Sequence, residues 1–306
     1  MSAARAKIIL PFAIVLAILA VSTASIFIRF AQDDGAPSLV IAALRLTFAT
    51  LLLAPVALTQ HRNELLRLSP RALLLGTASG VFLAVHFATW ISSLEYTTVA
   101  SSVVFVSTGP LWVAILSPML LKERLKSAAL FGLAFALTGG VIIGLADSCA
   151  WTSGGLTCST LSVRGQALWG NFLALLGAWA LTGYLIIGRK LRAETSLVPY
   201  IFFVYGVAAL TLLVIMFAAG ESPFGYAPQT YGWIFLLAAL PQLIGHSTYN
   251  WALKYLPAAL VAVTTLGEPI GSAVLAFFIL KETPGAATLI GGALILFGIY
   301  LTSRRN

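Results

Sequence analysis

Glu268 is the side chain of this sequence whose chemistry is most conspicuous. It lies within the otherwise apolar run "AVTTLGEPIGSAVLAFF", residues 262–278. Placing a carboxylate in lipid costs about 3 kcal/mol even on the lower, translocon-based scale. The group therefore needs a proton or a compensating partner. A group that alternates between a proton and a bound ammonium could couple proton movement to a cationic substrate. The structural alternative is a permanent Glu268–Arg45 bridge, or a hydrogen bond that fixes this segment beside Pro269.

Arg45 is the second charged residue inside an apolar segment, in "AALRLTFATLLL". It could serve as the counter-ion of a substrate carboxylate. It could also be a structural partner for Glu268 or for carbonyl groups at a helix end. We favour the structural role and treat Arg45 as one half of a candidate ion pair.

Two histidines and their aromatic neighbours form a second pattern. Phe82, His86 and Trp90 recur at i, i+4 and i+8 in "VFLAVHFATWISS", which places them on one helical face. In "GHSTYNWALKY", His246 shares a face with Tyr249 and Asn250. Such groups suit an apolar pocket with a few orienting polar contacts, although packing between helices remains an alternative for each.

For His86 we favour a functional role, whereas for His246 we favour a structural one. Trp179, in the middle of another apolar segment, is a weaker candidate. The residues predicted to bind substrate are His86, Trp90, Trp179, Tyr249, Asn250 and Glu268.

The elements that position these residues follow from composition. Apolar residues make up 59% of the 306-residue chain and charged residues only 9%, far from the composition of a soluble domain. The apolar residues fall into blocks of about twenty, the length of a helix that crosses about 30 Å of hydrocarbon. We therefore expect an all-α integral membrane protein with ten transmembrane helices, at 8–28, 38–58, 72–93, 98–120, 127–146, 167–187, 197–217, 231–253, 258–280 and 285–303.

The basic residues predict the orientation. With the N-terminus inside, fourteen of the eighteen basic residues lie at inner helix ends or in inner loops, as the positive-inside rule requires. We expect a multi-pass protein of the inner (plasma) membrane with both termini cytoplasmic, and we read the first apolar block as a retained span rather than a signal peptide. The net charge of +8 suits anionic lipid headgroups and needs no nucleic acid.

An internal repeat divides the chain. At an offset of 159 residues, Pro110 meets Pro269, Lys122 and Glu123 meet Lys281 and Glu282, and two glycines coincide. The sequence thus predicts a first five-helix repeat at 1–147, an outer linker loop at 148–165 and a second repeat at 166–306. Because five is odd, the two repeats would insert with opposite orientation, the arrangement typical of secondary transporters.

Prolines and glycines interrupt three of these helices. The fragments "VSTGPLW", "LPQLIGH" and "LGEPIGS" would loosen helical hydrogen bonding near the middle of the membrane. As a mirrored pair, Pro110 and Pro269 are candidate hinges.

The linker loop holds the two cysteines of the chain, Cys149 and Cys158, for which a disulfide and two separate thiols are equally plausible.

The two repeats, each ending in a proline-containing span, a "KE" turn and a glycine-rich span ("LLKERLKSAALFGLAFALTGG", "ILKETPGAATLIGGALILFG"), resemble the drug/metabolite transporter (DMT) superfamily, specifically its EamA-type exporters. The resemblance covers nearly the whole chain. It implies a pseudo-two-fold fold around a central cavity and the export of small metabolites, often amino acids.

Motifs for other chemistry are absent from the sequence. There is no HExxH metal motif, no phosphate-binding loop and no GxSxG elbow, so we expect no enzyme activity, no metal and no cofactor. The sequence therefore predicts a carrier that exports amino acids or related amines by alternating access, with proton coupling possible, as a monomer or homodimer. The alternatives are a cationic drug exporter and, less favoured, an intramembrane enzyme.

Overall fold

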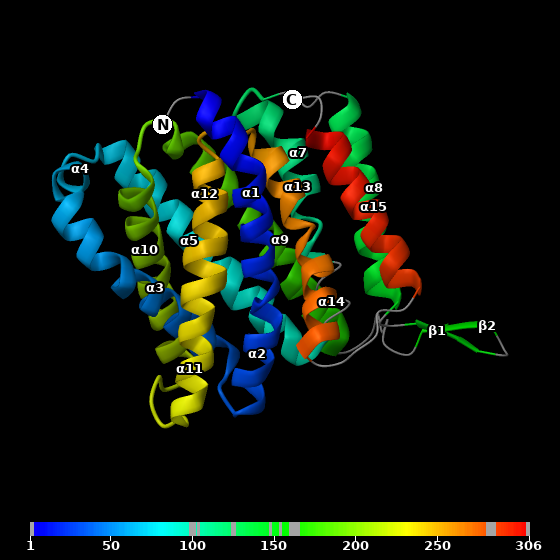
Figure 1. Ribbon diagram of the computed structural model, residues 1–306. Coiled ribbons are helices and arrows are strands. Elements are labelled where there is room, and N and C mark those ends of the chain that lie inside the picture. The colour runs from blue at the N-terminus through cyan, green and yellow to red at the C-terminus, as the bar shows by residue number, and fades with distance from the viewer. Residues whose placement is uncertain are drawn as a thin grey trace. The chain divides into compact units, whose positions relative to one another are not determined.

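The computed structural model describes residues 3–97, 102, 105–123, 127–146, 149–152, 155–158, 166–279 and 286–303, and most of them are helical (Figure 1). Helical segments occupy all ten predicted stretches. The helices are α1 (Ala3–Ser22), α2 (Ala24–Asp33), α3 (Ser38–Gln60), α4 (Arg62–Leu66), α5 (Pro70–Tyr96), α7 (Gly109–Leu120), α8 (Ser127–Ala146), α9 (Gln166–Arg192), α10 (Leu197–Ala218), α11 (Pro228–Leu237), the π-helix η1 (Ala238–His246), α12 (Ser247–Ala252), α13 (Ala258–Thr265), α14 (Glu268–Ile279) and α15 (Ala286–Ser303).

Five stretches among the described residues are long and apolar enough to cross a membrane: Ile9–Asp33, Ser38–Gln60, Pro70–Tyr96, Leu168–Arg192 and Leu197–Ala218. Large apolar side chains on the helices are highly exposed, for example Leu74 at 71% and Phe131 at 65%. Lipid rather than water suits such a surface. The chain is thus a multi-pass membrane protein.

Three of the helix breaks lie where proline and glycine predict them. Residues 107–108 separate a helical turn from α7, residues 266–267 separate α13 from α14, and η1 replaces α-helix around Pro241. The prediction of loosened helical hydrogen bonding is confirmed at all three places. The half-helices α7 and α14 start 159 residues apart and each has 12 residues, so the repeat offset also relates their positions along the chain.

The described contacts divide the chain into two compact units, each drawing on both sequence halves. Unit 1 comprises Met1–Ala88 and Gly183–Ala258, and unit 2 comprises Thr89–Thr182 and Ala259–Asn306. The long helices α5 and α9 contribute to both. The units therefore differ from the two sequence repeats, whose predicted boundaries at 147 and 166 rest on sequence similarity and stay a prediction.

Close helix approaches hold unit 1 together. Helix α3 packs along α10, and α1 packs along η1. Two glycines allow the closest approaches: a Cβ on Gly80 would lie 2.7 Å from Val207 on α10, and one on Gly245 would lie 2.4 Å from Val21 on α1. Side chains at these glycines would therefore separate the helices that surround the interior of unit 1.

Helices α8 and α15 run antiparallel, side by side, in unit 2 (Figure 1). Gly132 faces Gly298 and Gly139 faces Gly291: a Cβ on any of Gly132, Gly139 and Gly298 would lie 2.5 Å or less from an atom of the facing helix. Ala136, Leu266 and Ile295 form an apolar cluster beside this contact. Small residues let helix backbones approach closely in membranes, where dispersion rather than water exclusion drives packing.

The linker between the repeats adds one short hairpin to an otherwise helical chain. Strands β1 (Cys149–Thr152) and β2 (Gly155–Cys158) pair antiparallel in a short hairpin. The sequence analysis predicted only a loop here, because eight residues of strand give little periodicity. The strand register pairs Cys149 with Cys158, but their side chains lie outside the described residues, so the disulfide stays a prediction.

Candidate functional site

A group of buried polar side chains runs through unit 1, and Asn250 lies at its centre. Asn250 is 1% exposed and donates from Nδ2 to the His246 carbonyl at 2.8 Å, to the Tyr205 hydroxyl at 3.4 Å and to the Tyr184 hydroxyl. The Tyr205 hydroxyl lies 3.2 Å from the hydroxyl of Ser247. We call these five residues the polar cluster. The sequence analysis predicted that Asn250 binds substrate. In the structure, its hydrogen bonds connect α12 to α9 and α10.

Arg45 extends the polar cluster toward α3. Its side chain is 1% exposed, and its Nε donates to Gln242 Oε1 at 3.1 Å. Its guanidinium carbon lies 4.1 Å from the centre of the Phe87 ring, a cation–π arrangement. Gln242, which the sequence analysis did not single out, is thus one partner of Arg45. The predicted bridge to Glu268 would join the two units and stays a prediction.

Phe87 packs against His86 and His246, two of the histidines of unit 1. Its ring centre lies 4.9 Å from that of His86 and 5.3 Å from that of His246, the second in an edge-on contact. Tyr249 also lies edge-on to His246, with ring centres 6.4 Å apart. The sequence pattern pointed to Phe82 and Trp90 as neighbours of His86 and missed Phe87, the adjacent residue.

The π-helix η1 positions part of this group. A stretch of nine π-helical residues is rare, and π-helical turns are frequent at functional sites. Pro241 has no backbone N–H to donate, which favours the irregular hydrogen bonding. Because η1 carries Gln242 near its middle and His246 at its end, its geometry determines where both side chains lie.

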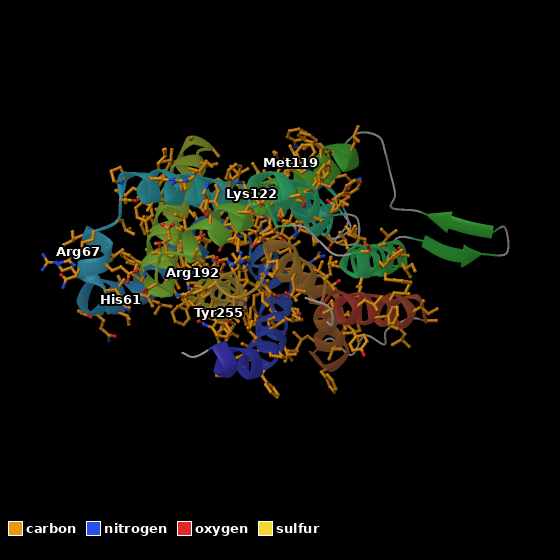
Figure 2. The ribbon with its side chains drawn as sticks, turned by 90° about the horizontal axis from the view of Figure 1, so that it is seen from above. His61, Arg67, Met119, Lys122, Arg192 and Tyr255 are labelled. Atoms are coloured by element: carbon orange, nitrogen blue, oxygen red, sulfur yellow. The ribbon has the colours of Figure 1, made fainter. Side chains whose placement is uncertain are left out.

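The polar groups continue to one end of unit 1, where two arginines bind backbone carbonyls of α12 and the turn after it. Arg192, 2% exposed, donates from Nε to the Asn250 carbonyl at 3.1 Å and from another nitrogen to the Thr195 carbonyl. Arg189 donates to the Leu253 carbonyl at 2.6 Å. Cations at a helix C-terminus compensate its unsatisfied carbonyls. His61, Arg67 and Arg192 mark this end in the view from above (Figure 2).

Unit 2 contains the two predicted tryptophans. Trp90 on α5 is 7% exposed. Trp179 on α9 is 41% exposed and meets Trp112 edge-on, with ring centres 5.6 Å apart. The Trp112 indole N–H donates to the Thr108 hydroxyl at 3.2 Å, and Thr108 is one of the two residues at the break before α7. Trp179 therefore lies against an irregular helix start.

Glu268 is the first residue of α14, directly after the break at 266–267. Its carboxylate thus lies in the first turn of a helix, where backbone N–H groups and the helix dipole stabilise negative charge. This position offsets part of the cost that the sequence analysis assigned to a carboxylate in the middle of a helix.

Pro110 and Pro269 are each the second residue of their half-helix, where a proline costs no hydrogen bond.

The described structure places no three His, Cys, Asp or Glu side chains together in a way that could hold a metal ion. The predicted site residues therefore fall into two groups. His86, Tyr249 and Asn250 belong to unit 1, whereas Trp90, Trp179 and Glu268 belong to unit 2.

Comparison with known proteins gives a consistent result. The model of the EamA-like transporter family matches twice, at residues 9–145 and 168–304, which again lie 159 residues apart. A solved crystal structure is similar over 95% of both chains, with a TM-score of 0.75 at 21% identity, which shows a shared fold.

Three relatives are similar at the level of sequence. An uncharacterized transporter of Archaeoglobus fulgidus is 24% identical over 95% of both chains. The pseudopaline exporter of Pseudomonas aeruginosa is 25% identical, also over 95% of both. A probable terminal-alkyne amino-acid exporter of Streptantibioticus cattleyicolor is 26% identical over 66% of this chain and 63% of its own length.

Proposed function

The chain belongs to the EamA-like transporter family, and we propose that it is a secondary carrier of the plasma membrane that exports amino acids or related amines by alternating access. Family membership, from two matches that together cover most of the chain, is the observation that carries this proposal. The carrier would have ten transmembrane helices in two inverted five-helix repeats, with both termini cytoplasmic.

The packing of α8 on α15 supports the inversion. These helices occupy equivalent places in the two family matches, yet they run antiparallel. A shift of 159 residues converts Gly132 into Gly291 and Gly139 into Gly298. The Gly132–Gly298 contact thereby becomes the Gly291–Gly139 contact, as a two-fold axis between the two helices would require.

The chemistry of the polar groups supports a small substrate with polar and apolar parts. Unit 1 offers buried hydroxyl and amide groups beside the rings of Phe87 and Tyr249. Two of the relatives described above are named as exporters, and one of these as an exporter of an amino acid. In our proposal His86, Trp90, Trp179, Tyr249, Asn250 and Glu268 contact the substrate during the transport cycle, and Glu268 exchanges a proton for its ammonium group.

Counterflow in proteoliposomes tests the function. Vesicles loaded with unlabelled leucine should take up labelled leucine faster than empty vesicles, because a carrier exchanges substrate across the membrane. A parallel experiment with vesicles loaded with tetraphenylphosphonium, an organic cation, tests the alternative of a cationic drug exporter. Uptake that loading does not accelerate would indicate a channel, and acceleration by the cation alone would overturn the amino-acid proposal.

Cysteine labelling tests the orientation. In a variant without Cys149 and Cys158, Arg67→Cys should resist an impermeant thiol reagent in intact cells, whereas Phe224→Cys should react. Phe224 is 79% exposed between α10 and α11, so its accessibility does not depend on unfolding. Arg192 is unsuitable for this test because it is buried. The opposite labelling pattern would reverse the topology.

A further inference from the structure

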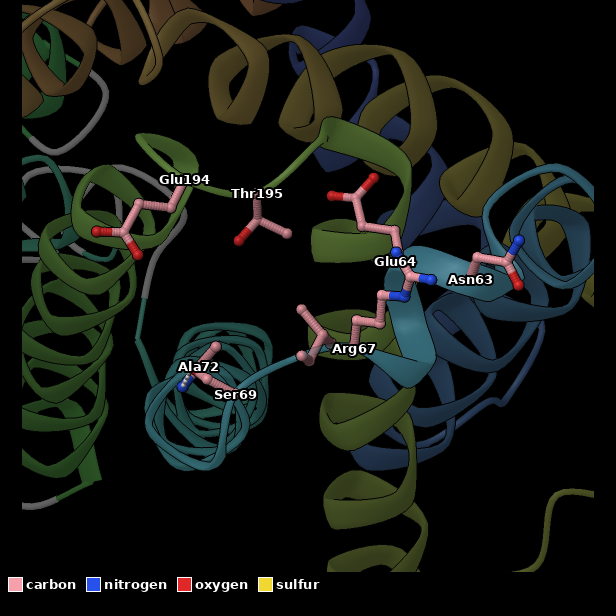
Figure 3. Close-up of a pocket in the computed structure, with 8 residues that line it drawn as sticks. Asn63, Glu64, Arg67, Ser69, Ala72, Glu194 and Thr195 are labelled. Atoms are coloured by element: carbon pink, nitrogen blue, oxygen red, sulfur yellow. Dashed lines mark hydrogen bonds between the residues drawn. The ribbon is translucent and has the colours of Figure 1, made fainter.

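A surface pocket of about 410 Å³ lies at the end of unit 1 where α4 meets the turn between α9 and α10 (Figure 3). Its polar lining consists of Asn63, Glu64, Arg67, Ser69, Glu194 and Thr195. Leu68 and Ala72 supply the apolar part. The volume falls within the range of sites for small molecules.

Hydrogen bonds fix the walls of this pocket. Glu64 Oε1 accepts from the N–H of Ser196, the residue before α10, at 2.7 Å, so a carboxylate lies at the N-terminus of that helix. Buried Arg192 holds the Thr195 carbonyl of the opposite wall. Ser69 accepts from the Ala72 N–H at 3.2 Å and caps the start of α5. The pocket is therefore bounded by ordered segments.

Two residues of opposite charge, Arg67 and Glu194, line this space at its two sides. Figure 3 shows Glu194 at one side of the pocket and Arg67 beside Glu64 at the other. Among the described residues, neither the Arg67 guanidinium nor the Glu194 carboxylate has a hydrogen-bond or ion-pair partner. Glu64 is already engaged at the N-terminus of α10, so Arg67 and Glu194 are the charges available to a ligand.

The inner wall of the pocket leads toward the polar cluster. An adjoining space of about 10 Å³ shares Leu68, Ala72 and Thr195 with it and reaches Tyr200, whose hydroxyl lies 3.1 Å from that of Ser79. That volume is at the lower limit for a single water molecule. Beyond it, a Cβ on Gly188 would lie 2.9 Å from the Tyr200 hydroxyl and 3.7 Å from Asn250 Oδ1.

We propose that this pocket binds a small zwitterion, with its ammonium group facing Glu194 and its anionic group facing Arg67 and the hydroxyl of Ser69. Charge-assisted hydrogen bonds of this kind are the stronger ones, and two of them at opposite sides would orient the ligand. One source of this chemistry is the amino-acid substrate, and that reading rests on the proposed function. The other source is the phosphoethanolamine headgroup of a lipid.

Titration calorimetry on the purified full-length protein tests the site. The probes are leucine, O-phosphoethanolamine, and vesicles of phosphatidylethanolamine or phosphatidylglycerol. Arg67→Gln and Glu194→Gln each remove one charge from an exposed side chain and should weaken zwitterion binding at least ten-fold. Arg71→Gln is the matched control, because Arg71 is an exposed arginine on the neighbouring first turn of α5 that does not line the pocket.

The outcomes separate the two sources. Loss of leucine binding in both pocket variants supports a site for the transported substrate. Loss of binding of O-phosphoethanolamine and phosphatidylethanolamine alone supports a lipid site, even where no amino acid is transported. Equal weakening by Arg71→Gln, or binding unchanged in both pocket variants, would overturn the proposal. Counterflow of leucine in the absence of any zwitterion binding here would overturn this inference and leave the proposed function intact.

Discussion

The buried polar groups of unit 1 and the α8–α15 contact of unit 2 rest on different physical interactions. Unit 1 encloses Arg45, Gln242, Tyr205 and Asn250, each 1% exposed or less, whereas the α8–α15 pair of unit 2 is packed through glycine and aliphatic side chains. A polar interior holds only while its groups find hydrogen-bond partners, and an interior of glycine contacts holds only while no volume is added. A substitution in one of these regions should therefore leave the stabilising contacts of the other unchanged.

The largest loss of stability is expected from Gly298→Leu. A Cβ at this position would lie 2.4 Å from the Gly132 carbonyl oxygen, so α8 and α15 must separate, at a cost of about 3 kcal/mol. Thermal unfolding in detergent measures the effect. Gly232→Leu is the control, because a Cβ at Gly232 meets nothing within 4 Å. Equal melting temperatures for the two variants would show that the glycine contact does not stabilise unit 2.

Gln242→Leu should have the next largest effect. It removes the acceptor of the Arg45 Nε–H in a buried site, which costs about 1–3 kcal/mol. Adding Arg45→Met should recover part of the melting temperature, because removing both polar partners is less costly than removing one. Transport should stay low in the double variant. Full recovery of counterflow would mean that the pair serves packing only.

Tyr205→Phe removes a single hydroxyl from the polar cluster. We expect a loss of about 1 kcal/mol together with a clear fall in transport per folded molecule. Tyr231→Phe is the matched control, because the Tyr231 hydroxyl donates to the Pro223 carbonyl at 2.9 Å, in the connection between α10 and α11. If both variants transport equally well, the hydroxyl of Tyr205 has no role beyond stability.

Glu268→Gln should change stability least. Loss of the charge at the first turn of α14 costs about 0.3–1 kcal/mol. Because glutamine cannot ionise, the variant should reach the membrane yet lose both counterflow and the pH dependence of substrate binding. A wild-type pH profile in this variant would eliminate proton exchange at Glu268 and leave a structural role.

The sequence predicted the positions of the helices and of three of their breaks because both follow from local chemistry, but it missed the break at Thr23 between α1 and α2. Apolar runs of about twenty residues define spans, and Pro241 or Gly267 weakens helical hydrogen bonding wherever the fold places it. The pairing of Arg45 with Gln242 could not be predicted, because the two residues are 197 positions apart and neither changes the local pattern. Gln242 lay within a fragment chosen for its proline and glycine, but nothing local identified the side chain.

Helical periodicity was also a weaker guide to the site than to the fold. It correctly placed His86 and Trp90 on one helix, but α5 divides between the units after Ala88. Burial adds a second difficulty. With exposures of 4% and 7%, both residues would leave cavities if replaced by alanine, so such variants would lose stability whatever their role in transport. His86→Gln, which retains volume and polarity, is the more informative change.

The pairs of facing glycines on α8 and α15 bear on the ancestry of the chain. Each contact takes one residue from each of the two copies, which are offset by 159 residues, so the last helix of one copy is buried against the last helix of the other. A single copy, translated alone, would find that surface only on a second molecule of itself inserted in the opposite direction. A gene duplication that fused two such molecules would turn an association dependent on concentration into a permanent neighbour within one chain.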